Sequence, residues 1–191
     1  LPFMEFHEMS DEDLIAVISF LRSQTPVKHA VPDHEVNFMG KVLLSYLIKP
    51  VGPAGEPPAT SPPEGPTIER GAYLANNVAA CVGCHTKRSM KDGSYIGPKF
   101  AGGGRFTLET PPGTVLVTPN LTPDPATGHL TWWSEQQFLD RFRAGSKIAG
   151  SHMPWAAYSR MSDDDIRAIY RFLRALPPVN QDNGPMVQTE E

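Results

Sequence analysis

Two cysteines and a histidine stand close together near the middle of this 191-residue chain and give its clearest chemical signal. Cys81 and Cys84 are the two cysteines of the sequence, and His85 follows directly, so that residues 81–85 read C-V-G-C-H. In a C-x-x-C-H pentapeptide, the thiols can reach both vinyl groups of a haem while the adjacent histidine meets the iron. The motif therefore predicts one covalent haem c, bound by the two cysteines through thioethers, with His85 as an axial ligand.

Three other uses of a C-x-x-C pair remain as alternatives. A structural zinc normally has four protein ligands, whereas this chain has two cysteines and no closely spaced histidine pair after them. A thioredoxin-like redox pair requires a strand-helix-strand setting, which the sequence around residues 70–100 does not show. A disulfide across two intervening residues would close a small, strained ring. Haem attachment fits the sequence better than any of these.

Composition narrows the class of protein. Seventeen basic against twenty-one acidic residues give a net charge of −4, which does not suggest non-specific binding to nucleic acid. Twenty prolines and sixteen glycines indicate a chain rich in loops, as expected for a small fold wrapped around a large prosthetic group. Covalent haem attachment implies an exported protein, so we expect a periplasmic location. A leader would have been removed or would lie upstream of Leu1.

Residues 9–27 and 161–179 resemble each other, with ten identities in nineteen positions. Each copy predicts a helix that begins at a serine cap, Ser10 or Ser162, carries acidic residues in its first turn and stops before a proline. Each helix also has an apolar stripe, formed by Leu14, Val17, Ile18 and Leu21 or by Ile166, Ile169, Tyr170 and Leu173. Internal duplication explains the shared caps better than two unrelated amphipathic helices do.

This repeat suggests a division of the chain. Residues 1–27 would be the terminal helix of an upstream haem domain, and the chain would be the C-terminal part of a longer protein with at least one more haem. Residues 28–66 would hold a short apolar helix at 36–48, followed by a linker rich in proline and glycine. The haem domain would span residues 67–179, and residues 180–191 would form a flexible tail.

Two helices are expected to frame the haem motif. One would run from about residue 69 into the motif, with Gly71 allowing a close crossing with the C-terminal helix 163–176 through Ile169, Tyr170 or Phe172. Another would begin at the capping box formed by Ser134 and Gln137 and end at Gly145, with Phe138 and Phe142 one turn apart on its buried face.

Several further motifs accompany C-V-G-C-H. They are R-G-A-Y-L (70–74), G-P-K-F-A-G-G (97–103), T-P-N-L-T-P-D (118–124), W-S (133–134) and M-P-W (153–155). Together they resemble the c-type cytochrome domain that is repeated in the multihaem cytochrome subunits of bacterial membrane-bound alcohol, gluconate and aldehyde dehydrogenases. The resemblance covers residues 69–179 and implies an all-α, monohaem fold whose activity is electron transfer.

The resemblance also implies the second axial ligand. Met153 lies 68 residues after His85, just before a proline and the C-terminal helix, where the family places its ligand methionine. A thioether ligand stabilises the ferrous state and raises the potential. His152, Met90 and Met161 are the rivals. In the upstream copy, 152 residues earlier, Leu1 stands at the ligand position and cannot bind iron, so the ligand of that haem is left open.

Other residues are proposed to support the haem. Pro98, in a Gly-Pro turn, resembles the proline whose carbonyl accepts the second ring N–H of the ligand histidine. A further group can reach haem propionates, although each member also has an ordinary role in a turn, core or surface: Arg105, Asn120, Trp132 and Trp133. Arg141, Arg143 and Lys147 are interpreted as a solvated face.

Five basic residues and one acid lie between residues 85 and 105, which predicts a basic rim that attracts an acidic redox partner. The leading function is therefore an electron carrier rather than an enzyme. It would take electrons from a membrane-bound dehydrogenase or an upstream haem and pass them toward a quinone or an oxidase, with peripheral membrane association as an option. An electron-feeding domain of a haem peroxidase and a haem-based gas sensor are the alternatives.

Overall fold

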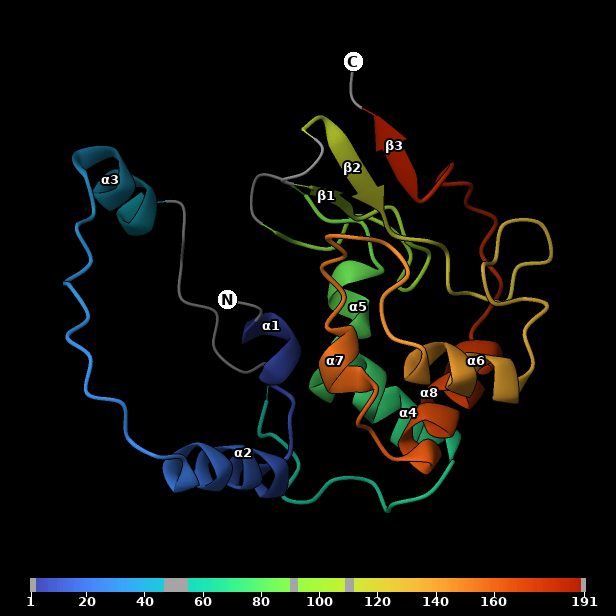
Figure 1. Cartoon of the computed structure of the whole chain (residues 1–191), viewed down its shortest axis with the longest axis horizontal. Helices are drawn as coiled ribbons and strands as arrows, with labels where there is room; N and C mark the ends of the chain where they lie inside the picture. The colour runs from blue at the N-terminus through green and yellow to red at the C-terminus, as the bar shows by residue number, and fades with distance from the viewer. Residues whose placement is uncertain (1–2, 47–54, 90–92, 109–111, 190–191) are drawn as a thin grey trace.

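The computed structural model of the chain describes residues 3–46, 55–89, 93–108 and 112–189 (Figure 1). Its helical elements are α1 (Phe3–Phe6), α2 (Asp11–Ser23), α3 (Phe38–Tyr46), α4 (Ile68–Tyr73), the π-helix η1 (Leu74–Val78), α5 (Cys81–Cys84), α6 (Glu135–Arg143), α7 (Trp155–Tyr158) and α8 (Asp163–Ala175). Its strands are β1 (Arg105–Thr107), β2 (Thr114–Val117) and β3 (Val187–Thr189).

Helices α4 and α8 cross closely at Gly71, as the sequence predicted. A Cβ atom built on Gly71 would lie 1.9 Å from the carbonyl oxygen of Ala168 and 2.9 Å from the Cβ atom of Phe172, so only glycine fits here. Arg70 strengthens the crossing, because its Nε donates to Asp165 at 2.9 Å. This contact joins α4 and α8, which are far apart in the sequence, in one core.

Helix α6 packs against α8 and begins at the predicted capping box. Ser134 accepts from the Gln137 backbone N–H, and the Gln137 side chain accepts from the Ser134 N–H. Phe138 and Phe142 are buried with ring centroids 4.8 Å apart, and the helix stops before Gly145, whose φ is +71°. The capping box thus fixes where the aromatic face of α6 starts.

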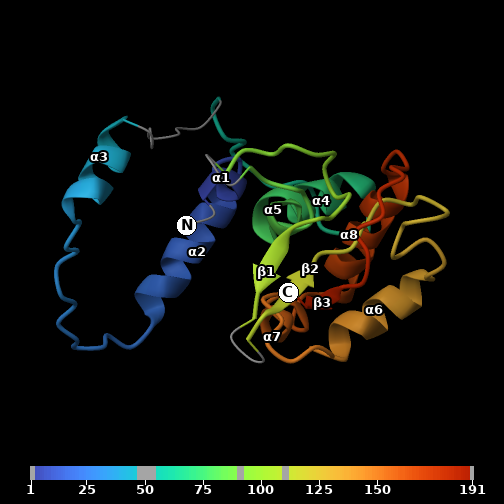
Figure 2. The same cartoon turned by 90° about the horizontal axis from the view of Figure 1, so that it is seen from above.

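The fold is mostly helical but not all-α, which corrects the expected fold class. Strands β1, β2 and β3 form a three-stranded antiparallel sheet in that order, with Phe106 opposite Leu116 and Leu116 opposite Val187. Figure 2 shows the sheet beside α5, and Figure 1 places the sheet above that helix. The strands are only three or four residues long, so their alternation was too short to be recognised in the sequence.

Residues 180–189 pack against the domain, whereas the sequence led us to expect a flexible tail. Strand β3 pairs with β2, and Gln181 and Asn183 both donate to the carbonyl of Ala101, at 3.0 and 2.8 Å. The segment is held by polar side chains, so it lacks the apolar pattern by which a packed segment is normally recognised in a sequence. The C-terminal segment therefore completes the sheet.

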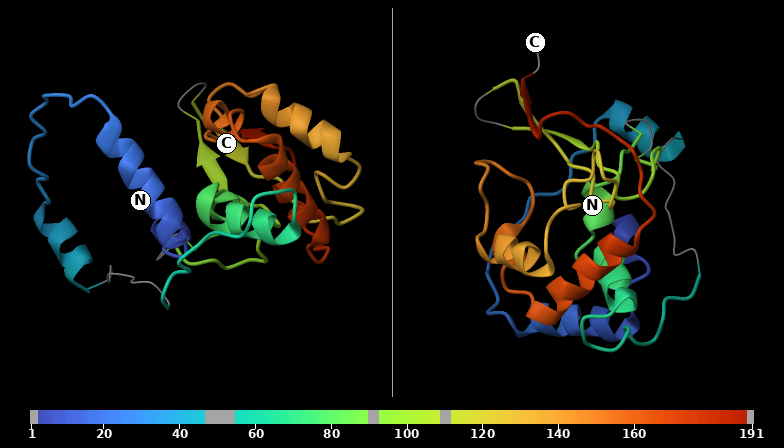
Figure 3. Two further views of the ribbon diagram at one scale, coloured as in Figure 1. Left: turned by 90° about the horizontal axis from the view of Figure 1, so that it is seen from below. Right: turned by 90° about the vertical axis from the view of Figure 1, so that its right-hand side faces the viewer.

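The N-terminal helices lie beside the domain rather than within it (Figure 3). The stripe of α2 that the repeat predicts is 45 to 63% exposed, while Ile166, Ile169 and Leu173 of α8 are buried. Helix α3 occupies part of the apolar run at 36–48, and its large apolar side chains are also exposed. None of the helices among the described residues has both the length and the apolar character needed to cross a bilayer.

Candidate haem site

A cavity of about 390 Å³ lies between α5, the sheet, α6 and the segment that precedes α8. Its walls are mostly apolar and aromatic. Cys81, Cys84 and His85 line it from α5, and Met153 lines it from the segment before α7. Further apolar or aromatic lining residues include Phe106, Leu116, Leu130, Trp133, Phe138, Phe142, Trp155, Ile169 and Leu173. The structure therefore brings together all four residues that the sequence proposed for thioether formation and axial ligation.

The residue that precedes α5 has a left-handed backbone conformation. Ala80 has φ 50° and ψ 35°, an uncommon conformation for a residue with a Cβ atom, and it turns the chain from η1 into α5. Tyr158 stabilises this turn from α7, because its hydroxyl donates to the Ala79 carbonyl at 2.5 Å. The turn sets both thiols against the cavity.

Both cysteines are free thiols. Burial raises the pKa of the Cys81 thiol to about 12 and also raises the pKa of the Cys84 thiol. The thiols are therefore protonated at neutral pH, consistent with their apolar surroundings. They are available for bonds to the macrocycle rather than held in a disulfide.

His85 is oriented by a backbone carbonyl. Its Nδ1 lies 3.2 Å from the carbonyl oxygen of Pro119, and since a carbonyl only accepts, Nδ1 carries the proton. Burial lowers the pKa of His85 to about 4, despite this hydrogen bond, so the ring is neutral at pH 7 with Nε2 unprotonated. A neutral imidazole with one oriented nitrogen is the form that binds iron.

The carbonyl beside His85 was assigned to the wrong proline. Pro98 was expected to accept the ring N–H, but its carbonyl accepts from the Ala101 backbone N–H at 3.2 Å within a turn. Pro119, in the T-P-N-L-T-P-D motif, holds the histidine instead. The family resemblance favoured Pro98, and only the fold places the other loop beside the ring.

Two rivals to Met153 also line the cavity. His152 is one of the alternative ligands that the sequence indicated. Met186, in the segment before β3, was not considered from the sequence. Met161 packs against the hydrophobic core but is not among the lining residues. Met90 lies outside the described residues. Met153 is partly buried and packs against the core, which suits a ligand enclosed by protein.

Of the proposed propionate group, Trp133 lines the cavity and three members do not. Trp132 is 82% exposed. Arg105 lies on β1, where it donates to Gln188 at 3.1 Å. Asn120 is buried and donates to Thr127 and to the Val179 carbonyl at 3.0 and 2.8 Å, so it secures a loop to the segment after α8.

The cationic side chains at the cavity are instead Arg141 and Lys147. The Arg141 guanidinium lies 3.8 Å from the centre of the Trp155 ring, and burial lowers its pKa. Both residues were interpreted as part of a solvated face; Lys147 is exposed, whereas Arg141 is partly buried. A signal was present, because Arg141 follows the buried Phe138 by three residues, a spacing that places two side chains on the same side of a helix.

The expected basic rim is smaller than its sequence suggests. Arg88 turns inward and forms an ion pair with Glu5, while Lys87 and Lys99 are exposed. Lys91 lies outside the described residues. The number of basic residues in a stretch of sequence thus overstated the charge available to a partner.

The cavity fits a haem on its own chemistry. Two thiols at C-x-x-C spacing and a neutral imidazole lie on one wall, and a thioether lies on another. Apolar and aromatic side chains fill most of the remaining lining, with two cations for carboxylate groups. Each part of a haem that needs a protein contact has a matching side chain here.

Comparison with known proteins agrees with this chemistry. Residues 68–177 match the family model described as Cytochrome c. The chain is 30% identical over 203 residues to the alcohol dehydrogenase (quinone) cytochrome c subunit of Gluconacetobacter polyoxogenes, which covers 96% of this chain and 41% of the relative. It is 33% identical over 112 residues to the fructose dehydrogenase cytochrome subunit of Gluconobacter japonicus, covering 56% of this chain and 21% of the relative.

The gluconate 2-dehydrogenase cytochrome c subunit of Pantoea cypripedii is 28% identical over 200 residues, covering 92% of this chain and 42% of the relative. The chain thus spans about two fifths of the length of the alcohol and gluconate dehydrogenase subunits that it resembles. The family match covers more than half of the chain and includes the whole cavity except Met186. This chain belongs to the cytochrome c family.

Proposed function

We propose that the chain carries one covalent haem and relays single electrons from a dehydrogenase, or from an upstream haem, toward a respiratory acceptor. Cys81 and Cys84 form the thioethers, and His85 and Met153 are the axial ligands. The observation that carries the proposal is that α5 and the M-P-W segment face one apolar cavity. The haem supplies a one-electron iron couple.

The chain's own residues suit this role in three ways. Pro119 orients His85, the aromatic lining excludes water, and the enclosed Met153 thioether favours the reduced iron. The named relatives are cytochrome subunits of dehydrogenases, which supports a dehydrogenase as the electron donor. Covalent haem attachment supports a periplasmic location. The haem domain at 67–179 and the upstream origin of residues 1–27 are part of the same proposal.

Carbon monoxide tests the proposal against its alternatives. When the gas is added to the reduced, haem-loaded chain, we expect the visible spectrum to stay unchanged, because His85 and Met153 fill both axial positions. A gas sensor or a peroxidase site has an open position and would show a shifted Soret band within seconds of mixing. Rapid binding to the wild-type chain would therefore contradict the electron-carrier proposal.

The cations at the cavity provide a second test. Replacing Arg141 or Lys147 with glutamine is expected to lower the midpoint potential, because a nearby positive charge favours the reduced iron. Redox titration of the holoprotein measures the effect. Arg143→Gln is the matched control, since Arg143 lies on the same helix but donates to the Met161 carbonyl at 2.8 Å, away from the cavity. If the Arg141 and Lys147 variants keep the same midpoint potential as the Arg143→Gln control and the wild type, the two cations do not contact the propionates.

A further inference from the structure

Glu5 of α1 is an acidic residue whose side chain is almost completely buried. Its side chain is 1% exposed, and it lies between Gly83 of α5 and the side chains of Arg88 and Tyr95. Oε1 accepts from the Tyr95 hydroxyl at 2.8 Å and forms an ion pair with Arg88, while Oε2 is buried without a hydrogen-bond partner among the described residues. Because an unpaired buried carboxylate is costly, Glu5 stays buried only while Arg88 remains in place.

Arg88 connects this carboxylate to the haem motif. Its Nε donates to the Gly83 carbonyl at 3.0 Å, and Gly83 lies between the two haem cysteines. Its other nitrogens donate to the Gly93 carbonyl at 3.2 Å and to the Tyr95 hydroxyl at 2.9 Å. The fixed fork of a guanidinium can hold three partners in one geometry, which an ammonium cannot do. Arg88 therefore ties α5 to the segment that follows it.

Glu5 also touches the motif directly. A Cβ atom built on Gly83 would lie 3.2 Å from Oε1 of Glu5, which is closer than an ordinary van der Waals contact. A side chain at Gly83 would therefore press on the carboxylate that pairs with Arg88 and Tyr95. One glycine of C-V-G-C-H is thus part of a docking surface for α1.

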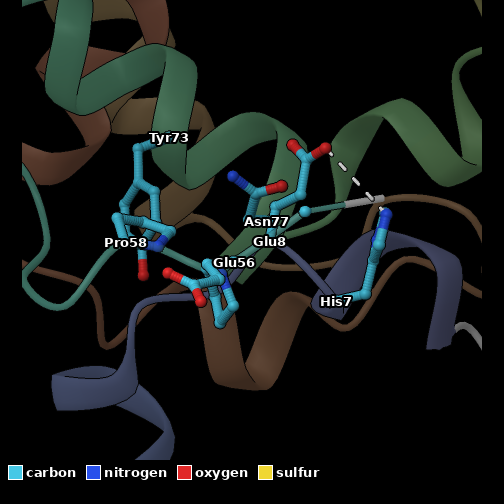
Figure 4. Close-up of a pocket in the computed structure, with 8 residues that line it drawn as sticks. His7, Glu8, Glu56, Pro58, Tyr73 and Asn77 are labelled. Carbon is cyan, nitrogen blue, oxygen red and sulfur yellow. Dashed lines mark ion pairs between the residues drawn. The ribbon is translucent and has the colours of Figure 1, made fainter. Parts of the chain in front are cut away.

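A second set of contacts holds the same stretch of chain, residues 5–13, here called the N-terminal arm. The Tyr73 hydroxyl accepts from the Ser10 backbone N–H at 3.0 Å and lies 2.5 Å from Oδ2 of Asp13, to which it donates. Tyr73 also lines a cavity of about 380 Å³ (Figure 4). Its lining residues are His7, Glu8, Gly55, Glu56, Pro57, Pro58, Tyr73 and Asn77.

The internal repeat does not account for Glu5. At the offset of 152 residues its counterpart is Ala157, an exposed residue of α7. Ser10 and its counterpart Ser162 both cap helices, yet Ser10 is buried and Ser162 is exposed. The buried contacts of the arm are therefore additions to the helical pattern, made where the arm meets the haem domain.

We propose that Glu5 is a positioning residue for the haem: acting through Arg88, its carboxylate fixes the Gly83 carbonyl, so that docking of the N-terminal arm sets the environment of the haem motif. This inference rests on the proposed attachment of haem at Cys81 and Cys84. The arm is then a connection through which any part of the protein joined to its N-terminal side acts on the redox centre.

Two variants of the haem-loaded chain test the inference. Glu5→Gln keeps the shape but removes the charge that holds Arg88, and Arg88→Lys keeps the charge but removes the fork that reaches Gly83. In both we expect amide hydrogen exchange within residues 81–85 to rise by about tenfold or more, since a hydrogen bond to a charged group is lost. In Glu5→Gln we also expect the midpoint potential to become more positive, because a buried negative charge has been removed.

Glu8→Gln is the matched control. Glu8 lies three residues from Glu5, its side chain is 62% exposed, and its ion pair is with His7 at 3.9 Å rather than with Arg88. The control should leave both the exchange of residues 81–85 and the potential unchanged. If the two test variants lose thermal stability but match the control in both readouts, the arm is only a stabilising contact and the inference is wrong.

Failure of the proposed function would look different. A wild-type chain whose pyridine haemochrome spectrum lacks the c-type signature would show that no haem is attached at Cys81 and Cys84, before any variant is compared. A normal haemochrome with unchanged exchange and potential in Glu5→Gln and Arg88→Lys would overturn the role of Glu5 alone.

Discussion

Replacing Met153 with alanine is expected to abolish the weak far-red absorption band of the oxidised, haem-loaded chain and to lower its midpoint potential. The band reports a sulfur bond to ferric iron, and the thioether is what stabilises the ferrous state. Alanine leaves an open position in the cavity, so the reduced variant should also bind carbon monoxide. Visible spectra with and without the gas measure both effects on one sample.

Met186→Ala and Met161→Ala are the controls, and they test different things. Met186 lines the same cavity as Met153, whereas Met161 packs against the core outside it. Both controls should keep the far-red band. Loss of the band in Met186→Ala together with its retention in Met153→Ala would move the ligand to the segment before β3. A wild-type spectrum without the band would favour His152.

Replacing Gly71 with alanine should destabilise the haem domain by about 3 kcal/mol, at the upper end of the usual cost of overpacking. The added methyl group would lie 1.9 Å from the carbonyl oxygen of Ala168, which is backbone and cannot rotate away. Helices α4 and α8 must then separate, and the core beneath the haem cavity loosens with them. Chemical denaturation of the holoprotein measures the change in unfolding free energy.

Gly55→Ala is the control for backbone entropy at glycine. A Cβ atom at Gly55 would meet nothing within 4 Å, and the residue is exposed. Its unfolding free energy should stay within about 0.5 kcal/mol of wild type. If Gly71→Ala unfolds at the same denaturant concentration as this control, the helices do not cross as closely as the structure indicates.

The repeated helices show how far a sequence pattern can be taken. Both copies carry the serine cap, the acidic first turn and the apolar stripe, and both form thirteen-residue helices, α2 and α8. The pattern predicts the helix because its caps and periodicity are local. It does not say what covers the stripe, and the stripe of α8 is buried in the core while that of α2 is exposed. What covers a stripe is decided by the rest of the fold.

The proposed supporting residues were mostly wrong for a related reason. Arg105, Asn120 and Trp132 were chosen by residue type and Pro98 by the family resemblance. In the structure Pro98, Arg105 and Asn120 have other hydrogen-bond partners, and Trp132 is exposed. Pro119 holds His85 and Arg141 lines the cavity, but they come from a loop and a helix whose approach depends on long-range packing. Residue type alone identifies what a side chain can bind, not what lies next to it.

By itself, the sequence determined the haem motif, the methionine candidate, the helix caps and the need for glycine at position 71. The motif, the caps and the glycine depend on covalent spacing, on local hydrogen bonds or on one tight contact, whereas the methionine candidate came from the family resemblance. Only the tertiary structure decided that β3 closes a small sheet, that Arg88 turns inward, and that Glu5 is buried against Gly83. Glu5 and Gly83 lie 78 residues apart in the chain, and contacts at such separations depend on how the whole chain packs.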